Sequence, residues 1–182
     1  MKLAQQPSHS SVTKPSASVP GENAFQGYWR VFGGTWQILR STYFWISGIL
    51  TLTLPKVWQT KDGSERVWTG ITLDVTPSLL GFALGGMAIM LAFSSGKFLE
   101  AIRQKGKDNS YLRKIMASFF HFCVVLTASI LTAYISRFYD NDYLSAVGVF
   151  LSYYGILLVL ATASRIWHTA RIFNAVSDAE KP

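Results

Sequence analysis

The chain has 182 residues, of which 49% are hydrophobic and only 15% are charged, and its formal net charge is +7. A mean hydropathy of +0.24 with so little charge excludes an ordinary soluble domain, in which about a quarter of the residues are charged. The basic excess needs no nucleic acid, because basic residues set membrane orientation and attract anionic lipid headgroups. We therefore expect membrane lipids as partners and no direct nucleic-acid binding.

The first 24 residues lack the apolar core of a cleavable signal peptide and are rich in Ser and Pro. They are predicted to form a flexible cytoplasmic tail. The next stretch, "AFQGYWRVFGGTWQILR", combines aromatic side chains with arginines, a composition typical of a segment at the membrane interface. Its Gly33–Gly34 pair is expected to interrupt it.

Long uncharged stretches follow. Three of them, residues 75–96, 115–136 and 143–164, contain 22 uncharged residues each. As helices they would be about 33 Å long, close to the hydrocarbon thickness of about 30 Å. A fourth gap, 41–55, has only 15 uncharged residues. A buried or re-entrant segment is the alternative there, but the apolar residues before Arg40 favour a tilted span over about 39–55.

The distribution of basic residues tests the number of spans. With four spans, 13 lysines and arginines lie on the side of both termini and 4 on the other. Without the first span the count becomes 9 against 8, and the expected cytoplasmic bias disappears. The predicted fold is therefore an all-α membrane protein with four transmembrane helices and both termini cytoplasmic. Residues 25–164 form its membrane domain.

The connections on the outer side are short. Between the first two spans, Val57-Trp58 and Val67-Trp68 flank an Asp-Gly pair, which predicts a small β-hairpin with its tryptophans at the membrane surface. The turn "RFYDND" predicts that spans three and four form a close antiparallel hairpin. After the last span, residues 165–182 are expected to form a separate amphipathic cytoplasmic helix and tail.

Small residues recur on one face of the second span. Pro77 suits the start of that helix, and the following small residues fall within about 80° of its surface. Such stripes let helices in lipid approach closely. The fourth span repeats the spacing from Ser145, so the two grooves are predicted to pack within one subunit, to join subunits of a homo-oligomer, or both. The predicted packing residues are Ser78, Gly81, Gly85, Ala88, Ala92, Gly148, Ser152 and Gly155.

The third span carries a line of polar residues within a similar arc: Ser118, His121, Ser129, Thr132 and Ser136. One interpretation is hydrogen bonding between helices and back to carbonyl groups. The other is the wall of a narrow polar path through an oligomer. His121 has no acidic partner in any predicted span, which argues against a proton relay.

Basic residues gather at the cytoplasmic ends of the spans. A surface for lipid or for an acidic cytoplasmic protein is predicted from Lys97, Arg103, Lys105, Lys107, Arg165 and Arg171. The sequence lacks nucleotide-binding glycine motifs and Cys/His metal motifs, and its one cysteine, Cys123, lies inside a span. No catalytic, cofactor or metal site is therefore predicted, and we do not expect an enzyme.

Residues Pro77 to Leu99, "PSLLGFALGGMAIMLAFSSGKFL", resemble a stretch in uncharacterised small multi-pass inner-membrane proteins of bacteria. Some four-span proteins of this kind, with cytoplasmic termini, are membrane subunits of phage-defence operons such as the Kiwa system. The resemblance implies a location in the bacterial inner membrane and a role in antiviral defence.

Two functional hypotheses follow from these patterns. The first is an oligomeric membrane scaffold or sensor that docks a cytoplasmic protein through its basic inner surface. The second is a small oligomeric pore or ion channel lined by the polar residues of the third span.

Overall fold

The structure is a computed structural model in which residues 23–63, 65–92 and 110–178 are described. Helices dominate these residues, with one very small sheet. In chain order the elements are α1 (Ala24–Phe32), α2 (Gly34–Leu39), α3 (Thr42–Thr53), α4 (Pro55–Gln59), β1 (Lys61–Asp62), β2 (Glu65–Arg66), α5 (Val67–Ala92), α7 (Tyr111–Ser136) and α8 (Asp142–Asp178).

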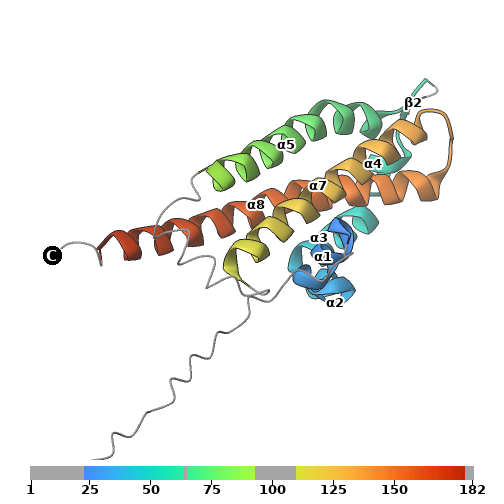
Figure 1. Cartoon of the computed structure of the whole chain (residues 1–182). Coiled ribbons are helices and arrows are strands. Elements are labelled where there is room, and N and C mark those ends of the chain that lie inside the picture. Colours follow the sequence, from blue (N-terminus) through green and yellow to red (C-terminus); the bar gives the residue numbers. More distant parts are fainter. Residues whose placement is uncertain (1–22, 64, 93–109, 179–182) are drawn as a thin grey trace, which may run out of the picture.

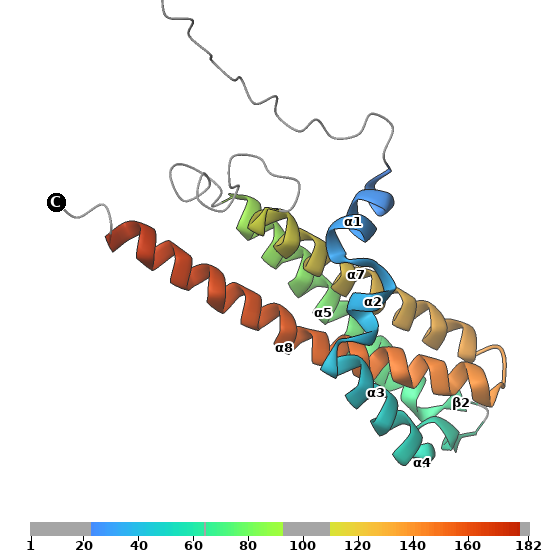
Figure 2. The ribbon, with the colours of Figure 1, turned by 90° about the horizontal axis from the view of Figure 1, so that it is seen from below.

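Three helices, α5, α7 and α8, are long and apolar enough to cross a membrane. They lie side by side and alternate in direction along the chain (Figures 1 and 2). Large apolar side chains cover their outer surfaces, where Phe82, Leu131 and Leu160 are all exposed. A helical bundle with an apolar exterior is typical of a membrane protein.

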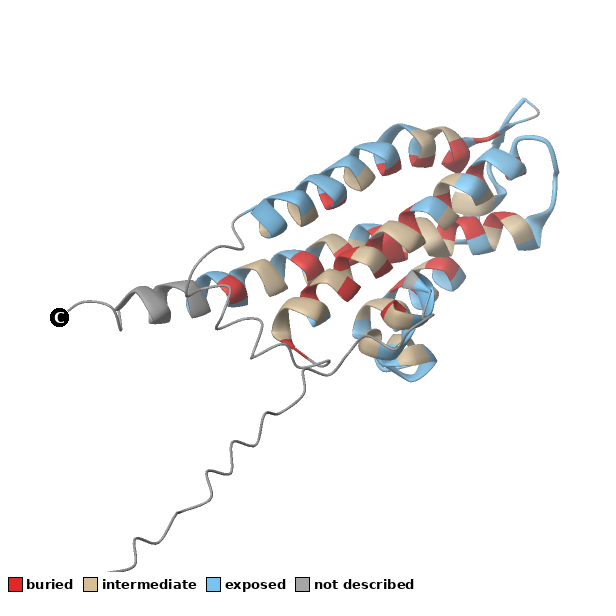
Figure 3. Ribbon diagram, in the orientation of Figure 1, coloured by how far each residue is buried: buried red, intermediate tan, exposed pale blue. Residues whose placement is uncertain are grey.

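The buried core lies where α5, α7 and α8 meet, as the buried residues of Figure 3 show. Its fully enclosed aromatic side chains are Phe119 and Phe122 of α7. Ala83 of α5 and Leu126 of α7 pack in the same cluster, and Tyr154 joins it from α8. One face of α7 is therefore buried against helices on both sides, which fixes the alignment of the bundle.

The first predicted span is broken into short helices. Gly33 and Gly34 both have positive φ, +94° and +68°, which ends α1 and begins α2 as the sequence predicts. Helix α3 has 12 residues, or about 18 Å, and α4 follows after Leu54 with a proline at its first turn. None of these short helices alone has the length of a membrane span.

The segment from α2 to β1 nevertheless runs along α8 toward the end of the bundle at Asp142 (Figure 2). Near its start, Arg40 lines a cavity together with Arg165 of α8. At its end, Lys61 pairs with Asp140, just before α8 begins. In between, α3 and α4 both pack against α8, and Figure 2 shows them beside that helix. The segment therefore has the same length as the part of α8 beside which it lies.

The predicted hairpin is present but smaller than expected. Lys61 pairs with Arg66, and Asp62 with Glu65, around a turn in which Gly63 has φ +61°. Its flanking Val-Trp pairs are helical rather than extended, because they belong to α4 and to the first turn of α5. Trp68 is also only 3% exposed, because its ring packs against Gly148 of α8 rather than lying on the outside of the protein.

Helix α5 starts ten residues earlier than Pro77, which lies inside the helix rather than at its start. Its missing N–H leaves the carbonyl of Leu73 without a helical partner, a cost that membrane helices often tolerate. Helix α8 differs from the prediction at its C-terminal end, where it is longer than expected. It runs without a break through Arg165 to Asp178, so the expected separate C-terminal helix is a continuation of the span.

Candidate functional site

The small residues of α5 point away from the bundle. Ser78, Gly81, Gly85, Ala88 and Ala92 are all exposed. A Cβ added at Gly81 or Gly85 would meet nothing within 4 Å. The side of α5 that faces the core instead carries Thr72, Thr76 and Ala83, together with larger residues.

The matching residues of α8 are enclosed. A Cβ at Gly148 would lie 2.1 Å from Cη2 of Trp68, and one at Gly155 would lie 2.8 Å from Cδ2 of Leu126. Contacts this short are forbidden, so only glycine allows these side chains to pack on α8. The prediction that the grooves of α5 and α8 face each other within a subunit is therefore wrong. The groove of α8 receives side chains from α5 and α7, whereas that of α5 receives none from the described residues.

Ser152 connects three helices. Its Oγ lies 2.9 Å from the Thr72 hydroxyl of α5 and 2.9 Å from the Ser129 hydroxyl of α7, and it also donates to the carbonyl of Gly148. Ser129 is fully buried. Polar contacts of this kind between membrane helices contribute about 0.6 kcal/mol each on average.

The other polar residues of α7 also face the protein rather than an empty channel. His121 is 4% exposed, with Nδ1 2.6 Å from the hydroxyl of Tyr28 and Nε2 3.0 Å from that of Tyr154. Thr132 and Ser118 donate back to carbonyls one turn earlier, and Ser136 is buried. The polar residues of α7 therefore make their contacts within one protomer. A pore between subunits would instead require these residues on the outer face of the protomer.

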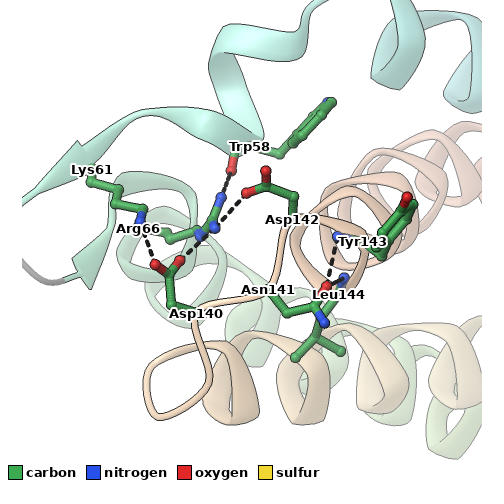
Figure 4. A network of polar contacts seen from close by, with 8 residues as sticks. All are labelled: Trp58, Lys61, Arg66, Asp140, Asn141, Asp142, Tyr143 and Leu144. Atoms are coloured by element: carbon green, nitrogen blue, oxygen red, sulfur yellow. Dashed lines mark hydrogen bonds and ion pairs between the residues drawn. The ribbon is translucent and has the colours of Figure 1, made fainter.

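A network of ion pairs closes the end of the bundle that carries the hairpin (Figure 4). Arg66 is 3% exposed and donates from Nη2 to Asp140 at 2.5 Å and to Asp142 at 2.6 Å. Its Nη1 donates to the carbonyl of Trp58 at 2.7 Å. Lys61 pairs with Asp140 as well. We call Lys61, Arg66, Asp140 and Asp142 the outer clasp.

The outer clasp joins the hairpin to the connection between α7 and α8. Its ion pairs with Lys61 and Arg66 hold the pKa of Asp140 below the ordinary value of 3.8. Asn141, between the two aspartates, accepts hydrogen bonds from the first backbone N–H groups of α8. The clasp was not predicted, although two acidic residues in one outer turn and two basic residues in the other were a usable signal.

The predicted basic surface is only partly described. Lys97, Arg103, Lys105 and Lys107 lie outside the described residues. Arg165 and Arg171 lie on α8 beyond its apolar stretch, where both line one open groove with His168. Within the described ranges, no group of three or more His, Cys, Asp or Glu side chains is arranged to hold a metal ion.

No protein-family model, curated protein or solved structure matches this chain. The resemblance of residues 77–99 to inner-membrane proteins of phage-defence operons therefore stays a prediction. The contacts within the molecule carry the functional argument instead.

Proposed function

We propose that this protein is an oligomeric scaffold of the bacterial inner membrane, with four membrane crossings, which docks a cytoplasmic protein. It acts through assembly and contact rather than through chemistry of its own. The observation that carries the proposal is the outward-facing stripe of small residues on α5, from Ser78 to Ala92, which no part of the described protomer covers.

Four crossings are supported by the path of the chain between Arg40 and Lys61. Its start lies near Arg165 of α8 and its end pairs with Asp140 just before α8, so α3 and α4 together can form the first crossing although neither is long enough alone. The proposed orientation can be measured with single cysteines in a Cys123→Ser background. A membrane-impermeant maleimide is expected to label Asp62→Cys in intact cells and not Ser8→Cys. Labelling of both positions would instead mean three crossings.

Assembly is supported by the physics of helix association in lipid. Lipid tails are as apolar as leucine, so membrane helices associate through close packing rather than through the hydrophobic effect. Within the described part of the protomer, nothing packs close to Gly81 or Gly85, because a Cβ added at either would meet nothing within 4 Å. A second copy of the same helix is a partner whose backbone can enter such a groove.

Docking of a cytoplasmic protein is supported by the inner end of the bundle. Helix α8 extends 37 residues, or about 56 Å, which exceeds the hydrocarbon core by several turns. The part beyond the core carries Arg165 and Arg171, and the sequence before α7 carries Lys105 and Lys107. An acidic protein surface is the complementary partner for these residues.

The experiment is intact-mass measurement of the complex purified in a polymer that retains native lipid. The wild-type mass is expected to be a multiple of 20.3 kDa plus an attached soluble protein. Gly85→Leu is expected to give single subunits, because its side chain fills the groove. Ala163→Leu, which places the same side chain at an exposed site on α8, is the matched control.

A single-subunit mass for the wild type, or an unchanged oligomer in Gly85→Leu, would contradict assembly through α5. The docking surface is tested in the same preparation. Lys105→Glu with Lys107→Glu is expected to release the soluble protein while the oligomer remains, and retention of that protein would rule out these lysines as its site.

A further inference from the structure

The inner end of the bundle contains a polar cavity of about 190 Å³. It lies between the α2–α3 connection and the helices α7 and α8. Arg40 at the end of α2 and Arg165 of α8 both line it, and Gln37 and Tyr154 add further polar groups. Two arginines that are distant in sequence therefore line one partly open cavity.

The charges around this cavity are of one sign. No aspartate or glutamate is found among the described residues that line it. None of the ion pairs formed within residues 23–63, 65–92 and 110–178 includes Arg40 or Arg165. Two arginines without a carboxylate partner favour an anion, and the planar guanidinium fork matches the oxygens of a phosphate.

A second, more open groove of about 740 Å³ adjoins the cavity through shared residues, Tyr43, Ala161 and Arg165. It adds His168 and Arg171 and again contains no carboxylate among its described residues. The two spaces together can hold a phosphate and the small polar group attached to it.

The depth of the cavity identifies the kind of phosphate. Along α8, Arg165 lies about 34 Å from Asp142, close to one hydrocarbon thickness. With Asp142 at the outer surface, Arg165 lies at the level of the inner lipid phosphates. Leu158 and Ala161 of α8 also line the cavity, which suits the glycerol and first carbons of a lipid.

We propose that this cavity binds the phosphate group of an anionic phospholipid in the inner leaflet. The choice of a lipid over a soluble phosphate compound rests on the membrane orientation given under the proposed function. Basic pockets between membrane helices on the cytoplasmic side are a general way to hold such headgroups.

The bound phosphate also acts on α1 through three side chains. A neutral imidazole has one donor and one acceptor nitrogen, so one of Tyr28 and Tyr154 donates to His121 and the other accepts from it. A phosphate oxygen that accepts a hydrogen bond from the Tyr154 hydroxyl selects one direction, in which Tyr28 donates to Nδ1 and Nε2–H donates to the Tyr154 oxygen. Lipid binding therefore fixes the direction of the hydrogen bond that joins α1 to α7.

The test uses delipidated full-length protein in detergent and native mass spectrometry. The probes are phosphatidylglycerol, diacylglycerol without a phosphate, and inorganic phosphate. Arg40→Gln with Arg165→Gln is expected to weaken phosphatidylglycerol binding roughly tenfold or more, since each loses charge-assisted hydrogen bonds. Arg137→Gln, a half-exposed arginine at the other end, is the matched control. Tyr154→Phe keeps the ring and is expected to weaken binding less.

The proposal is overturned if the double variant binds phosphatidylglycerol as the wild type does, or if diacylglycerol binds equally well. Equally tight binding of inorganic phosphate would overturn the lipid assignment in favour of a soluble ligand. If the double variant fails to fold, Arg40→Gln alone, at an exposed helix end, gives the same comparison. Binding in detergent needs no oligomer, so a single-subunit mass in native lipid would refute assembly while lipid binding in detergent would leave this site standing.

Discussion

Two helices of this protein, α5 and α8, carry small residues at the same spacing, yet the bundle uses them in opposite ways. On α8 the glycines receive Trp68 and Leu126, whereas on α5 the added Cβ atoms would meet open space. Helix α8 lies at the centre, with α3, α4, α5 and α7 around it, while α5 packs mainly on α7. A stripe of small residues therefore shows that close approach is possible, and its neighbours determine whether it occurs.

The largest expected effect is that of Gly148→Leu. Its side chain would overlap the ring of Trp68, which is 3% exposed and cannot move aside. Overpacking of this kind typically costs about 1–3 kcal/mol, and more where the neighbour is rigid. We expect unfolding in detergent at markedly lower temperature than for the wild type, with Gly85→Leu as the matched variant on α5. Equal unfolding midpoints for the two variants would contradict the difference between the grooves.

An intermediate effect is expected from Arg66→Ala, because Arg66 lies two residues before Trp68 and holds the start of α5 against α8. The change removes the ion pairs to Asp140 and Asp142 together with the bond to the Trp58 carbonyl. The unfolding midpoint is expected to fall, and Arg137→Ala, which loses one exposed pair with Glu65, is the control. If both variants unfold alike, the outer clasp contributes no more than a surface pair.

The stability that the ion pairs of the outer clasp contribute also depends on pH. The pKa of Asp140 is lowered in the folded protein, first by Lys61 and then by Arg66. Its contribution is therefore complete above the ordinary value of 3.8 and is lost as the pH falls through the lowered value. The difference in midpoint between wild type and Asp140→Asn should be constant near neutral pH and shrink in strong acid.

The smallest effect is expected from Gly81→Ala, since the new methyl group meets nothing within 4 Å. Alanine is favoured over glycine inside a helix by about 1 kcal/mol, so the protomer should keep or slightly raise its unfolding midpoint. A clear loss of protomer stability would show that the stripe of α5 is packed after all.

Much of the helical architecture was predictable because membrane spans are set by length and charge. Residues 75–96, 115–136 and 143–164 all fall within or largely within helices of membrane length. The Asp-Gly turn and the break at Gly33–Gly34 were also predictable, since local backbone geometry requires glycine there. The start of α5 was not, because Pro77 is tolerated inside that helix and its rule as a helix starter did not apply.

The candidate sites were less predictable. Helical spacing placed Ser129 and His121 on one face, but whether that face met other helices or a channel was open. Their partners, Ser152, Tyr28 and Tyr154, come from other elements. Likewise Arg40 and Arg165 are 125 positions apart in the chain, and no local pattern relates them.

The sequence by itself determined that this protein belongs in a bilayer. Its long apolar segments are unfavourable in water, and each has the length of a hydrocarbon core. It also determined which residues share a helix face, since the α-helical repeat is local. Only the tertiary structure decided which small-residue face is filled, which ends are tied by the outer clasp and where two arginines meet. Those outcomes depend on the shapes and charges of neighbouring helices, which short-range spacing does not contain.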